Sequence, residues 1–402
     1  MRWPRHRHPL SGLRVLDLTT VIAGPYTTQL LGDFGADVIK VEPPGGDMTR
    51  DIGVARNEKM TALFLGSNRN KRSVVLDLKR LAAREALWRL VDGADILIHN
   101  IRPQKMAKLG FDPDSVLARN NKIVYGALLG YREDGPYGGM PAYDDVVQGQ
   151  SGLAGTFQAR DGEPVLTPTI TADKTAALLA SNGLLAGVIQ RLITGKGVYV
   201  ETSMFEGLVG YTLLEHQDGS MFRPPASGPG YPRALSPERR PHRTRDGYLC
   251  LLAYTDDQWR RFWDLIGAPG QALDPRFLSV GARADNIDAL YRIAGEALAA
   301  DDTESWLARL SEAEIPAGAV NRLEDLRDDR HLQATGFFRS FEHPSEGTLE
   351  IPDTAYRFDR EPLPVRRPQP RLGEHGHEVL AEAGLSDDEI EQALGEGAES
   401  DR

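Results

Sequence analysis

The sequence has almost no cysteine: Cys250 is the only one among 402 residues. A single cysteine cannot form a disulfide within the chain, so the fold has to be held together by its core and its polar contacts. Such sparing use of cysteine is typical of proteins that work in a reducing compartment. We therefore expect a cytoplasmic protein.

Histidine clusters and excess basic charge are also missing. The nine histidines show no metal-protease spacing, and His375 and His377 would point to different faces of a helix, so we expect no metal site. The formal net charge is -11. That balance argues against a nucleic acid as the main partner, because phosphate backbones are bound by basic surfaces.

No hydrophobic run is long enough to indicate a membrane segment. The most apolar stretch, Ala176 to Ile189, contains Ser181, Asn182 and two glycines, and it is too short to cross a bilayer. The basic first residues are not followed by the apolar core of a secretion signal. We expect no membrane partner.

Several familiar catalytic motifs are absent as well. Gly195-Lys196 lacks the spacing of a phosphate-binding loop, and Arg233 stands where a dinucleotide fingerprint starting at Gly228 needs its third glycine. The segment around Ser151 lacks the last glycine of a serine-nucleophile elbow. The chemistry has to be sought in other residues.

What the sequence does contain is a regular alternation of strand-like and helix-like segments. Short apolar runs at residues 14–18, 37–41, 73–78, 95–100, 122–126 and 198–201 are separated by stretches of helical length. Buried strands that alternate with helices predict a parallel α/β sheet. The predicted fold class is α/β, with a large Rossmann-like domain and a smaller α/β domain.

The length exceeds what one hydrophobic core usually organises, so more than one domain is expected. Residues 224–243 are dense in proline and arginine and predict a linker. We expect the N-terminal part of a large domain over residues 1–224, a small domain over 225–325, and a C-terminal segment over 326–402 that returns to the large domain. Within that segment, residues 378–394 read as one amphipathic helix.

Two charged features have more than one interpretation. The cationic turn Asn68-Arg69-Asn70-Lys71-Arg72 is either a solvated loop or an attractor for an anionic ligand. Asp173 precedes a run of small and apolar residues, and we expect a helix that begins at Lys174. A carboxylate at such a position is either a helix cap or a nucleophile.

An ordered set of short motifs runs along nearly the whole chain. These motifs include Ala23-Gly24-Pro25, Gly46-Asp47-Met48-Thr49-Arg50, Asn100-Ile101-Arg102-Pro103, Ala142-Tyr143-Asp144, Asp173, Thr194-Gly195-Lys196-Gly197 and Leu372-Gly373-Glu374-His375. In this order and spacing the sequence resembles the family III CoA-transferases, the group that includes formyl-CoA and carnitine CoA-transferases. It departs from that pattern over residues 227–243 and in lacking the glycine-rich lid of formyl-CoA transferase.

The resemblance implies a transferase that uses Asp173 as its nucleophile. The carboxylate attacks an acyl-CoA, a mixed anhydride and then an aspartyl-CoA thioester form, and CoA passes to a carboxylic acid. Coenzyme A and acyl-CoA are then substrates, and no permanently bound cofactor is required. Members of the family form interlocked, ring-like homodimers, so a homodimer is expected.

The same resemblance implies CoA contacts at a further set of positions. They are Ile22, Ala23, Leu76, Asp77, Leu78, Lys79, Asn100, Ile101, Arg102, Lys108, Met140, Pro141, Ala142 and Tyr143.

Two other functions compete with CoA transfer. A 2-methylacyl-CoA racemase resembles the transferases but carries a histidine before the aspartate that aligns with Asp144, where this chain has Tyr143. Proton exchange at an α-carbon needs a group that titrates near neutrality, which tyrosine does not. A non-catalytic CoA-binding protein is the alternative of another class.

Overall fold

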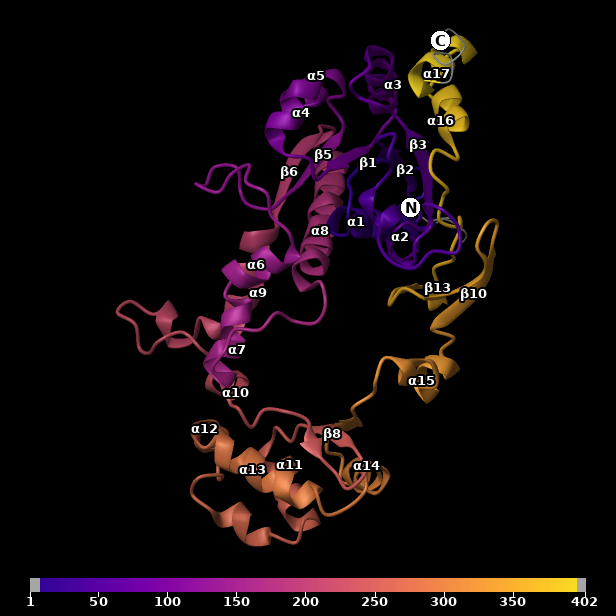
Figure 1. Ribbon diagram of the computed structural model, residues 1–402. Coiled ribbons are helices and arrows are strands. Elements are labelled where there is room, and N and C mark those ends of the chain that lie inside the picture. Colours follow the sequence, from indigo (N-terminus) through magenta and orange to yellow (C-terminus); the bar gives the residue numbers. More distant parts are fainter. Residues whose placement is uncertain (1–7, 396–402) are drawn as a thin grey trace. The chain divides into compact units, whose positions relative to one another are not determined.

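The computed structural model describes residues 8–395, which form two compact units. The large unit comprises residues 8–151, 167–210 and 336–395, and the small unit comprises residues 152–166 and 211–335. The three-part division expected from the sequence stays a prediction. Each unit is described by itself (Figure 1).

The large unit is built on one parallel sheet of six strands. The strands are β1 (Arg14–Leu18), β2 (Asp37–Glu42), β3 (Lys71–Val75), β4 (Ile96–His99), β5 (Val124–Leu129) and β6 (Val198–Ser203). Their order is β3-β2-β1-β4-β5-β6, and every neighbouring pair is parallel. The α/β fold class predicted from the sequence is confirmed.

Helices and two small hairpins complete the large unit. The helices are α1 (Ala23–Asp33), α2 (Ala62–Ser67), α3 (Leu81–Asp92), α4 (Pro103–Leu109), α5 (Pro113–Arg119), α6 (Asp144–Gln150), α8 (Thr171–Thr194), the first half of α9 (Met204–His216), α16 (Gly376–Glu382) and α17 (Asp387–Leu394). The hairpins pair β10 (Phe338–His343) with β11 (Gly347–Pro352) and β12 (Arg357–Phe358) with β13 (Glu361–Pro362).

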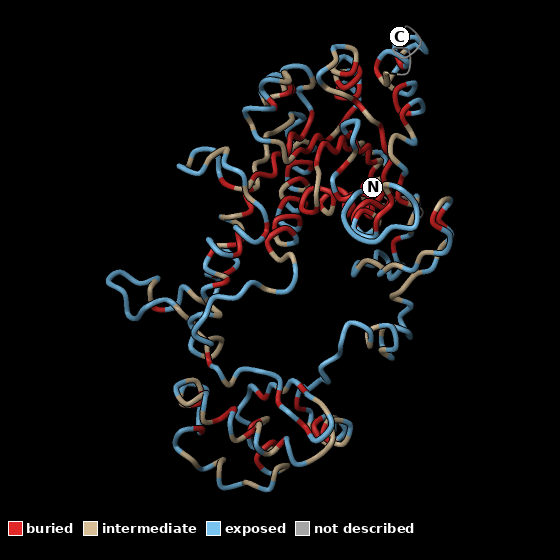
Figure 2. The backbone as a smooth tube through the Cα atoms, in the orientation of Figure 1, coloured by how far each residue is buried: buried red, intermediate tan, exposed pale blue. Residues whose placement is uncertain are grey.

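Alternate residues of each strand feed two cores on opposite faces of the sheet. On one face Leu16 and Leu97 pack with side chains of α3, α4, α5, α16 and α17. On the other face Val15 and Ile96 pack with side chains of α1 and α8. Figure 2 shows this buried layer along the strands and along α8. The sheet is therefore covered on both faces, as a parallel sheet must be.

Helix α8 is the longest helix among the described residues. It spans 24 residues and is apolar enough to cross a membrane by length and composition alone. The same test is passed by the core helix of a soluble protein, and α8 packs against α1 and β6. Gly183 and Gly187 allow α8 to lie close to the sheet, because a Cβ at Gly187 would lie 2.8 Å from Val124 of β5 and 3.2 Å from Val200 of β6.

Three element boundaries predicted from the sequence are wrong. Helix α8 begins at Thr171 instead of Lys174, which puts Asp173 inside its first turn. The helix predicted over 378–394 is interrupted after Glu382, where Gly384 adopts a φ of +81°. The strand predicted over 73–78 covers Lys71–Val75, because Asp77 starts a turn in which its carboxylate accepts from Lys79 N–H.

The cationic turn at residues 68–72 is buried, so neither of its two interpretations holds. Arg69 forms a bidentate pair with Asp33, at 2.8 Å for both bonds. Lys71 lies 3.0 Å from Asp17, and both side chains are fully buried. A buried charge has to be paired, and here the carboxylates come from β1 and α1. These cations hold the sheet to α1 and are not available to a ligand.

The small unit has its own aromatic core. Its elements are α7 (Leu153–Asp161), α10 (Pro232–Leu235), β7 (His242–Arg243), β8 (Tyr248–Leu251), α11 (Asp256–Leu265), α12 (Val280–Asp285), α13 (Ile287–Leu298), α14 (Thr303–Glu312), β9 (Ala317–Ala319) and α15 (Arg330–Ala334). Trp259, Trp263 and Trp306 are all buried in that core together with Phe262. A core of this size explains how the unit can be compact without the large sheet.

Candidate active site

The candidate site lies where β1 and β4 end. These two strands are neighbours, and the strand order reverses between them. In open parallel sheets, the crevice beyond the carboxyl ends at such a reversal is where ligands bind. Thr20, after β1, and Asn100, after β4, are joined here by two hydrogen bonds. Thr20 N–H donates to Asn100 Oδ1 at 3.0 Å, and Asn100 Nδ2 donates to Thr20 O at 2.8 Å.

A pocket of about 480 Å³ opens at this crevice. It brings together Asp173 and eight of the residues for which the resemblance implies CoA contacts. Those eight are Ala23, Asn100, Ile101, Arg102, Met140, Pro141, Ala142 and Tyr143. They come from the ends of two strands, the loop before α6 and the first turn of α8.

Six residues with predicted CoA contacts do not line the pocket. Leu76 is buried in the core and Leu78 packs against it, so their side chains have apolar partners already. Ile22 is buried at the start of α1. Asp77 binds its own turn, whereas Lys79 and Lys108 are exposed outside the pocket lining. The CoA contacts of all these residues stay a prediction.

Sequence reasoning did not identify a number of the residues that line the pocket. They are Thr20, Val21, Pro103, Lys105, Leu128, Leu129, Gly130, Tyr131, Gly139 and Met204. Lys105 could have been found, because it lies three residues after Arg102, in the helix that starts just past the end of β4. Leu128, Leu129 and Gly130 end β5, and the strand-end rule that singled out Arg102 applies to them too.

The residue Asp173 is only 9% exposed. Its carboxylate has no hydrogen-bond partner among residues 8–395, although its main-chain N–H donates to Asp144 Oδ1 at 3.0 Å. Burial, and second the negative charge of Asp144, raise the pKa of the Asp173 carboxyl to about 6. Such a carboxylate is mostly ionised at neutral pH, is poorly solvated, and has its lone pairs free to react.

Asp144 fixes the start of α8 through a polar network. Its Oδ2 accepts from Gln148 Nε2 at 2.6 Å, and Gln148 Oε1 accepts from Thr167 N–H at 2.9 Å. Thr167 Oγ1 lies 2.7 Å from Thr171 Oγ1. The residue before α8, Ile170, cannot cap the helix with its side chain. The network from α6 therefore replaces a local cap and orients the first turn that carries Asp173.

Three unpaired cations lie on α4 and on the residue just before it. Arg102, Lys105 and Lys108 are spaced by three residues, and all three are exposed. None of them has an ion-pair partner in the part of the chain that the structure describes. Arg102 and Lys105 line the pocket, and Lys108 lies one turn further along. Together these positive charges attract an anion toward this side of the pocket.

A neutral histidine, His99, ends β4 directly before the pocket residue Asn100 but does not itself line the pocket. His99 is 2% exposed, and burial lowers its pKa to about 4. Its Nδ1 accepts from Ile101 N–H at 3.2 Å, and its Nε2 lies 3.0 Å from the Tyr125 hydroxyl. No histidine lines the pocket within residues 8–395. An acid–base histidine for proton exchange is therefore missing from the described site.

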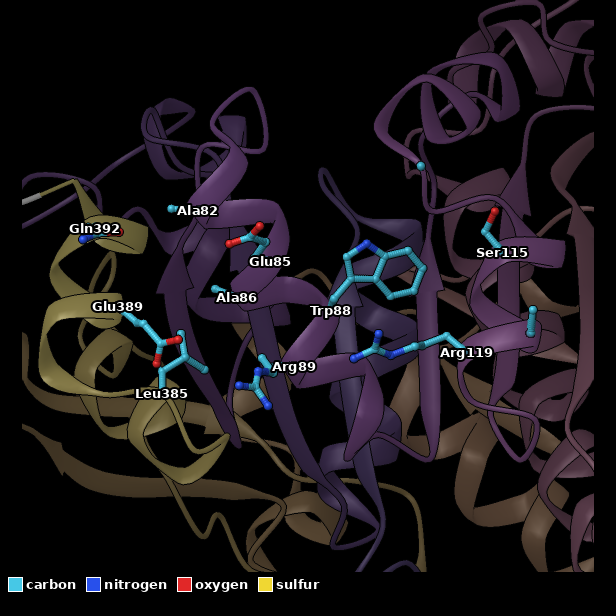
Figure 3. A pocket seen from close by; sticks show the side chains of 12 residues that line it. Ala82, Glu85, Ala86, Trp88, Arg89, Ser115, Arg119, Leu385, Glu389 and Gln392 are labelled. Carbon is cyan, nitrogen blue, oxygen red and sulfur yellow. The ribbon is translucent and has the colours of Figure 1, made fainter.

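A second, larger pocket of about 770 Å³ shares no lining residue with the first. Figure 3 shows Trp88 and Arg119 at this pocket, with Leu385 and Glu389 on the C-terminal side. Trp88 stacks on Phe111 with ring centroids 4.5 Å apart. Arg119 pairs with Asp92 through two bonds of 2.6 Å. Trp88 and Arg119 are therefore already engaged within the fold.

A resident metal ion is not suggested by the described residues. Among residues 8–395, no group of three or more His, Cys, Asp or Glu side chains could hold one. Among the described residues, Asp173 is the one acidic side chain that lines the pocket, and its neighbour Asp144 already accepts two hydrogen bonds.

Comparison with known proteins identifies the family. Residues 10–376 match the model of CoA-transferase family III, and the chain belongs to that family. The chain is 35% identical over 393 residues to succinate–glutarate CoA-transferase of Agrobacterium fabrum, covering 94% of this chain and 96% of the relative. It is 30% identical to formyl-CoA:oxalate CoA-transferase of Rhodopseudomonas palustris, covering 97% of this chain and 96% of the relative. The resemblance read from the sequence is confirmed.

Solved structures agree with the sequence comparison. The crystal structure of Rv3272 from Mycobacterium tuberculosis superposes with a TM-score of 0.80 at 30% identity, covering 92% of this chain and 99% of that one. The expectation that the chain is a CoA-transferase enzyme is therefore confirmed at the level of the family.

Proposed function

We propose that this protein transfers CoA from an acyl-CoA donor to a carboxylic acid, with Asp173 as the covalent nucleophile. The observation that carries the proposal is the Asp173 carboxylate, which lies in the pocket without a hydrogen-bond partner among the described residues. Its raised pKa, to about 6, makes it more basic and hence more nucleophilic than an exposed aspartate while it stays ionised at pH 7.

The proposed reaction has four steps that balance without ATP or a redox partner. An Asp173 oxygen attacks the thioester carbonyl, the C–S bond breaks, and CoA thiolate leaves a mixed anhydride behind. The thiolate then attacks the Asp173 carbonyl and releases the donor acid, giving the aspartyl-CoA thioester. The acceptor carboxylate displaces the thiolate, and the thiolate finally takes the acceptor acyl group. Asp173 returns to its carboxylate, so the thioester free energy is conserved throughout.

The unpaired cations of α4 support binding of an acyl-CoA. CoA carries a diphosphate and a phosphomonoester. Arg102 and Lys105 offer exposed positive charges in the pocket that contains Asp173, and Lys108 offers a third one turn further along α4. Arginine and lysine are the side chains that meet phosphate groups most effectively. We infer that these residues hold the phosphates while the acyl end reaches the buried carboxylate. No permanently bound cofactor is needed in this scheme.

The relatives suggest which substrates to test first. One relative is named for succinate and glutarate, and another is named for formyl-CoA and oxalate. We infer a small carboxylic acid as acceptor, and succinyl-CoA with glutarate is the first pair to test. The screen then extends to other acids and donors, with product acyl-CoA measured directly.

We also infer that the protein is a homodimer that works in the cytoplasm. Helix α8 carries large apolar side chains that the described chain leaves exposed, among them Ile189 at 58%, Leu192 at 77% and Ile193 at 79%. An apolar surface of this kind is normally covered by a partner. Solution scattering that gives the mass of a monomer at micromolar concentration would contradict the dimer.

The central experiment traps the intermediate. The protein is incubated with an acyl-CoA and then with hydroxylamine or borohydride, and the peptide that contains Asp173 is analysed by mass spectrometry. Modification of Asp173 in the wild type, and its loss in Asp173→Asn, is the expected result. Asp145→Asn is the matched control, because Asp145 is an exposed carboxylate on α6 outside the pocket lining. Exchange of the substrate α-proton without trapping would indicate a racemase, and neither event would indicate a binding protein.

A further inference from the structure

The turn that joins β1 to α1 is strained at Val21. This residue adopts a φ of +73°, in the left-handed region that β-branched side chains avoid. Val21 and its neighbour Thr20 both line the pocket that contains Asp173. A strained conformation persists only where surrounding contacts enforce it, so the contacts of this turn identify what shapes this wall of the pocket.

Three side chains from outside the turn enforce its conformation. Asp47 Oδ1 accepts from Val21 N–H at 3.2 Å. Lys40 Nζ donates to Thr19 O at 2.9 Å and to Asp47 Oδ2 at 2.9 Å. On the other side, the Asn100 side chain makes both of its hydrogen bonds to the backbone of Thr20. Side-chain hydrogen bonds from outside the turn therefore fix the backbone at three consecutive residues, Thr19, Thr20 and Val21.

Asp47 is the residue of this group that reaches Val21 directly. It does not line the pocket, and both Asp47 and Lys40 have fully buried side chains. Asp47 is itself held in place, because its main-chain N–H donates to Glu42 Oε2 and its Oδ1 accepts from Thr49 N–H and Thr49 Oγ1. A carboxylate fixed so firmly can hold a neighbouring amide in an unfavourable conformation.

A second close contact stabilises the same turn from α1. A Cβ added at Gly24 would lie 2.2 Å from Thr19 Cβ, so the helix can approach the turn only with glycine there. Thr19 Oγ1 also donates to Asp17 Oδ1. Thr19 is thus fixed on three sides, which leaves Val21 as the position where the chain has to bend back sharply to enter α1.

We propose that Asp47 is a positioning residue for the transfer reaction: by holding Val21 in its left-handed conformation it sets the pocket wall against which the acyl-CoA meets Asp173. The inference rests on the proposed function, because its readout is the acylation of Asp173. It predicts that Asp47 acts on the reaction through the conformation of one backbone residue and through no contact with the substrate.

The test is a double-mutant cycle between Asp47 and Val21. Asp47→Ala is expected to slow single-turnover acylation of Asp173 about tenfold, equal to about 1.4 kcal/mol. Val21→Gly lets the turn adopt a positive φ without strain, and its acylation rate is the reference for the double variant. In that glycine background, Asp47→Ala is expected to slow acylation by no more than about threefold, since the conformation no longer has to be enforced. Asp47→Asn keeps an acceptor oxygen and should retain most of the wild-type rate.

Two controls separate positioning from general stability. Asp33→Ala breaks another buried ion pair, that with Arg69, without touching the turn, and should lower the Tm but leave the rate per folded molecule unchanged. If Asp47→Ala does not fold because Lys40 is left unpaired, the cycle is repeated with Asp47→Leu plus Lys40→Met, which removes both charges.

The outcomes are distinguishable. An equal rate loss from Asp47→Ala with Val21 and in the glycine background would overturn the positioning role. A Tm decrease without a rate loss would overturn it as well. Failure of the proposed function is a different result, because then the wild type would show no modification of Asp173 at all.

Discussion

The main-chain N–H of Asp173 donates to the Asp144 carboxylate, so one aspartate orients the backbone of the other at an N···O distance of 3.0 Å. The same contact brings two carboxylates of α6 and α8 close together. Like charges disfavour each other's ionisation, and Asp144 is, after burial, the second cause of the raised pKa of Asp173. Asp144 thus orients the backbone of the proposed nucleophile and adds to the effect of burial on its pKa.

The first prediction concerns the pH dependence of activity. Because the pKa of Asp173 is about 6, its reactive carboxylate is lost by protonation below that pH. The value of kcat/KM should fall about tenfold per pH unit in the acid limb. Asp144→Asn removes a negative charge and should move the midpoint of that limb to lower pH. The midpoint is measured on the folded fraction, with Asp145→Asn as the control that should leave it in place.

The second prediction concerns stability. The folded pKa of Asp173, about 6, is higher than its ordinary value of 3.8, so the folded protein binds a proton more tightly than the unfolded chain between these values. The stability that this proton provides is fully present below pH 3.8 and is lost as the pH rises through 6. Asp173→Asn should therefore raise the free energy of unfolding at pH 7 by on the order of 1–2 kcal/mol.

Urea unfolding at a series of pH values checks this. The gain from Asp173→Asn should be largest above pH 6 and should shrink toward zero below pH 4. A gain that is independent of pH would contradict the assigned cause, and a loss of stability at pH 7 would contradict the prediction outright.

The third prediction concerns the cations of α4. Arg102→Gln, Lys105→Gln and Lys108→Gln should each raise the KM for the acyl-CoA by about 3- to 10-fold with little change in kcat, since they contribute to binding and not to bond breaking. The effect should shrink at high salt. Lys122→Gln is the control, because Lys122 is an exposed lysine just before β5, at the opposite end of the strand from the pocket.

The fourth prediction concerns Gly130 at the end of β5. A Cβ there would lie 2.4 Å from the Cβ of Ala142, so Gly130→Ala should displace the loop before α6 and lower kcat/KM by about tenfold. Ala142→Gly removes the Cβ with which the new side chain at position 130 would clash. The double variant should recover most of the activity, and a double variant as impaired as Gly130→Ala alone would show that the steric account is wrong.

The strands of the large sheet could be predicted because they are short apolar runs that need no distant partner to be recognised. The start of α8 could not be predicted from the sequence. An aspartate is a common cap, so the sequence favours a helix after Asp173, whereas the helix begins at Thr171 and is oriented by Asp144, which lies 29 residues earlier. That contact exists only once α6 and α8 are packed.

The two interpretations of the cationic turn at residues 68–72 were wrong for the same physical reason. Arg69 and Lys71 look solvated in sequence, and their carboxylate partners, Asp33 and Asp17, lie 36 and 54 residues away. These charges meet only once α1 has packed on the sheet and β1, β2 and β3 lie side by side. Lys105, by contrast, was within reach of sequence reasoning, because it lies between Arg102 and Lys108, two cations that sequence reasoning had already singled out.

The distribution of tryptophan gives each unit its own optical signal. Within residues 8–395, Trp88 is the single indole of the large unit, whereas Trp259, Trp263 and Trp306 belong to the core of the small unit. Trp3 lies outside the described residues. In a Trp3→Phe background, emission from a Trp88→Phe variant would follow the small unit alone. Comparison with the parent would then reveal whether both halves of the molecule melt in one transition or in two.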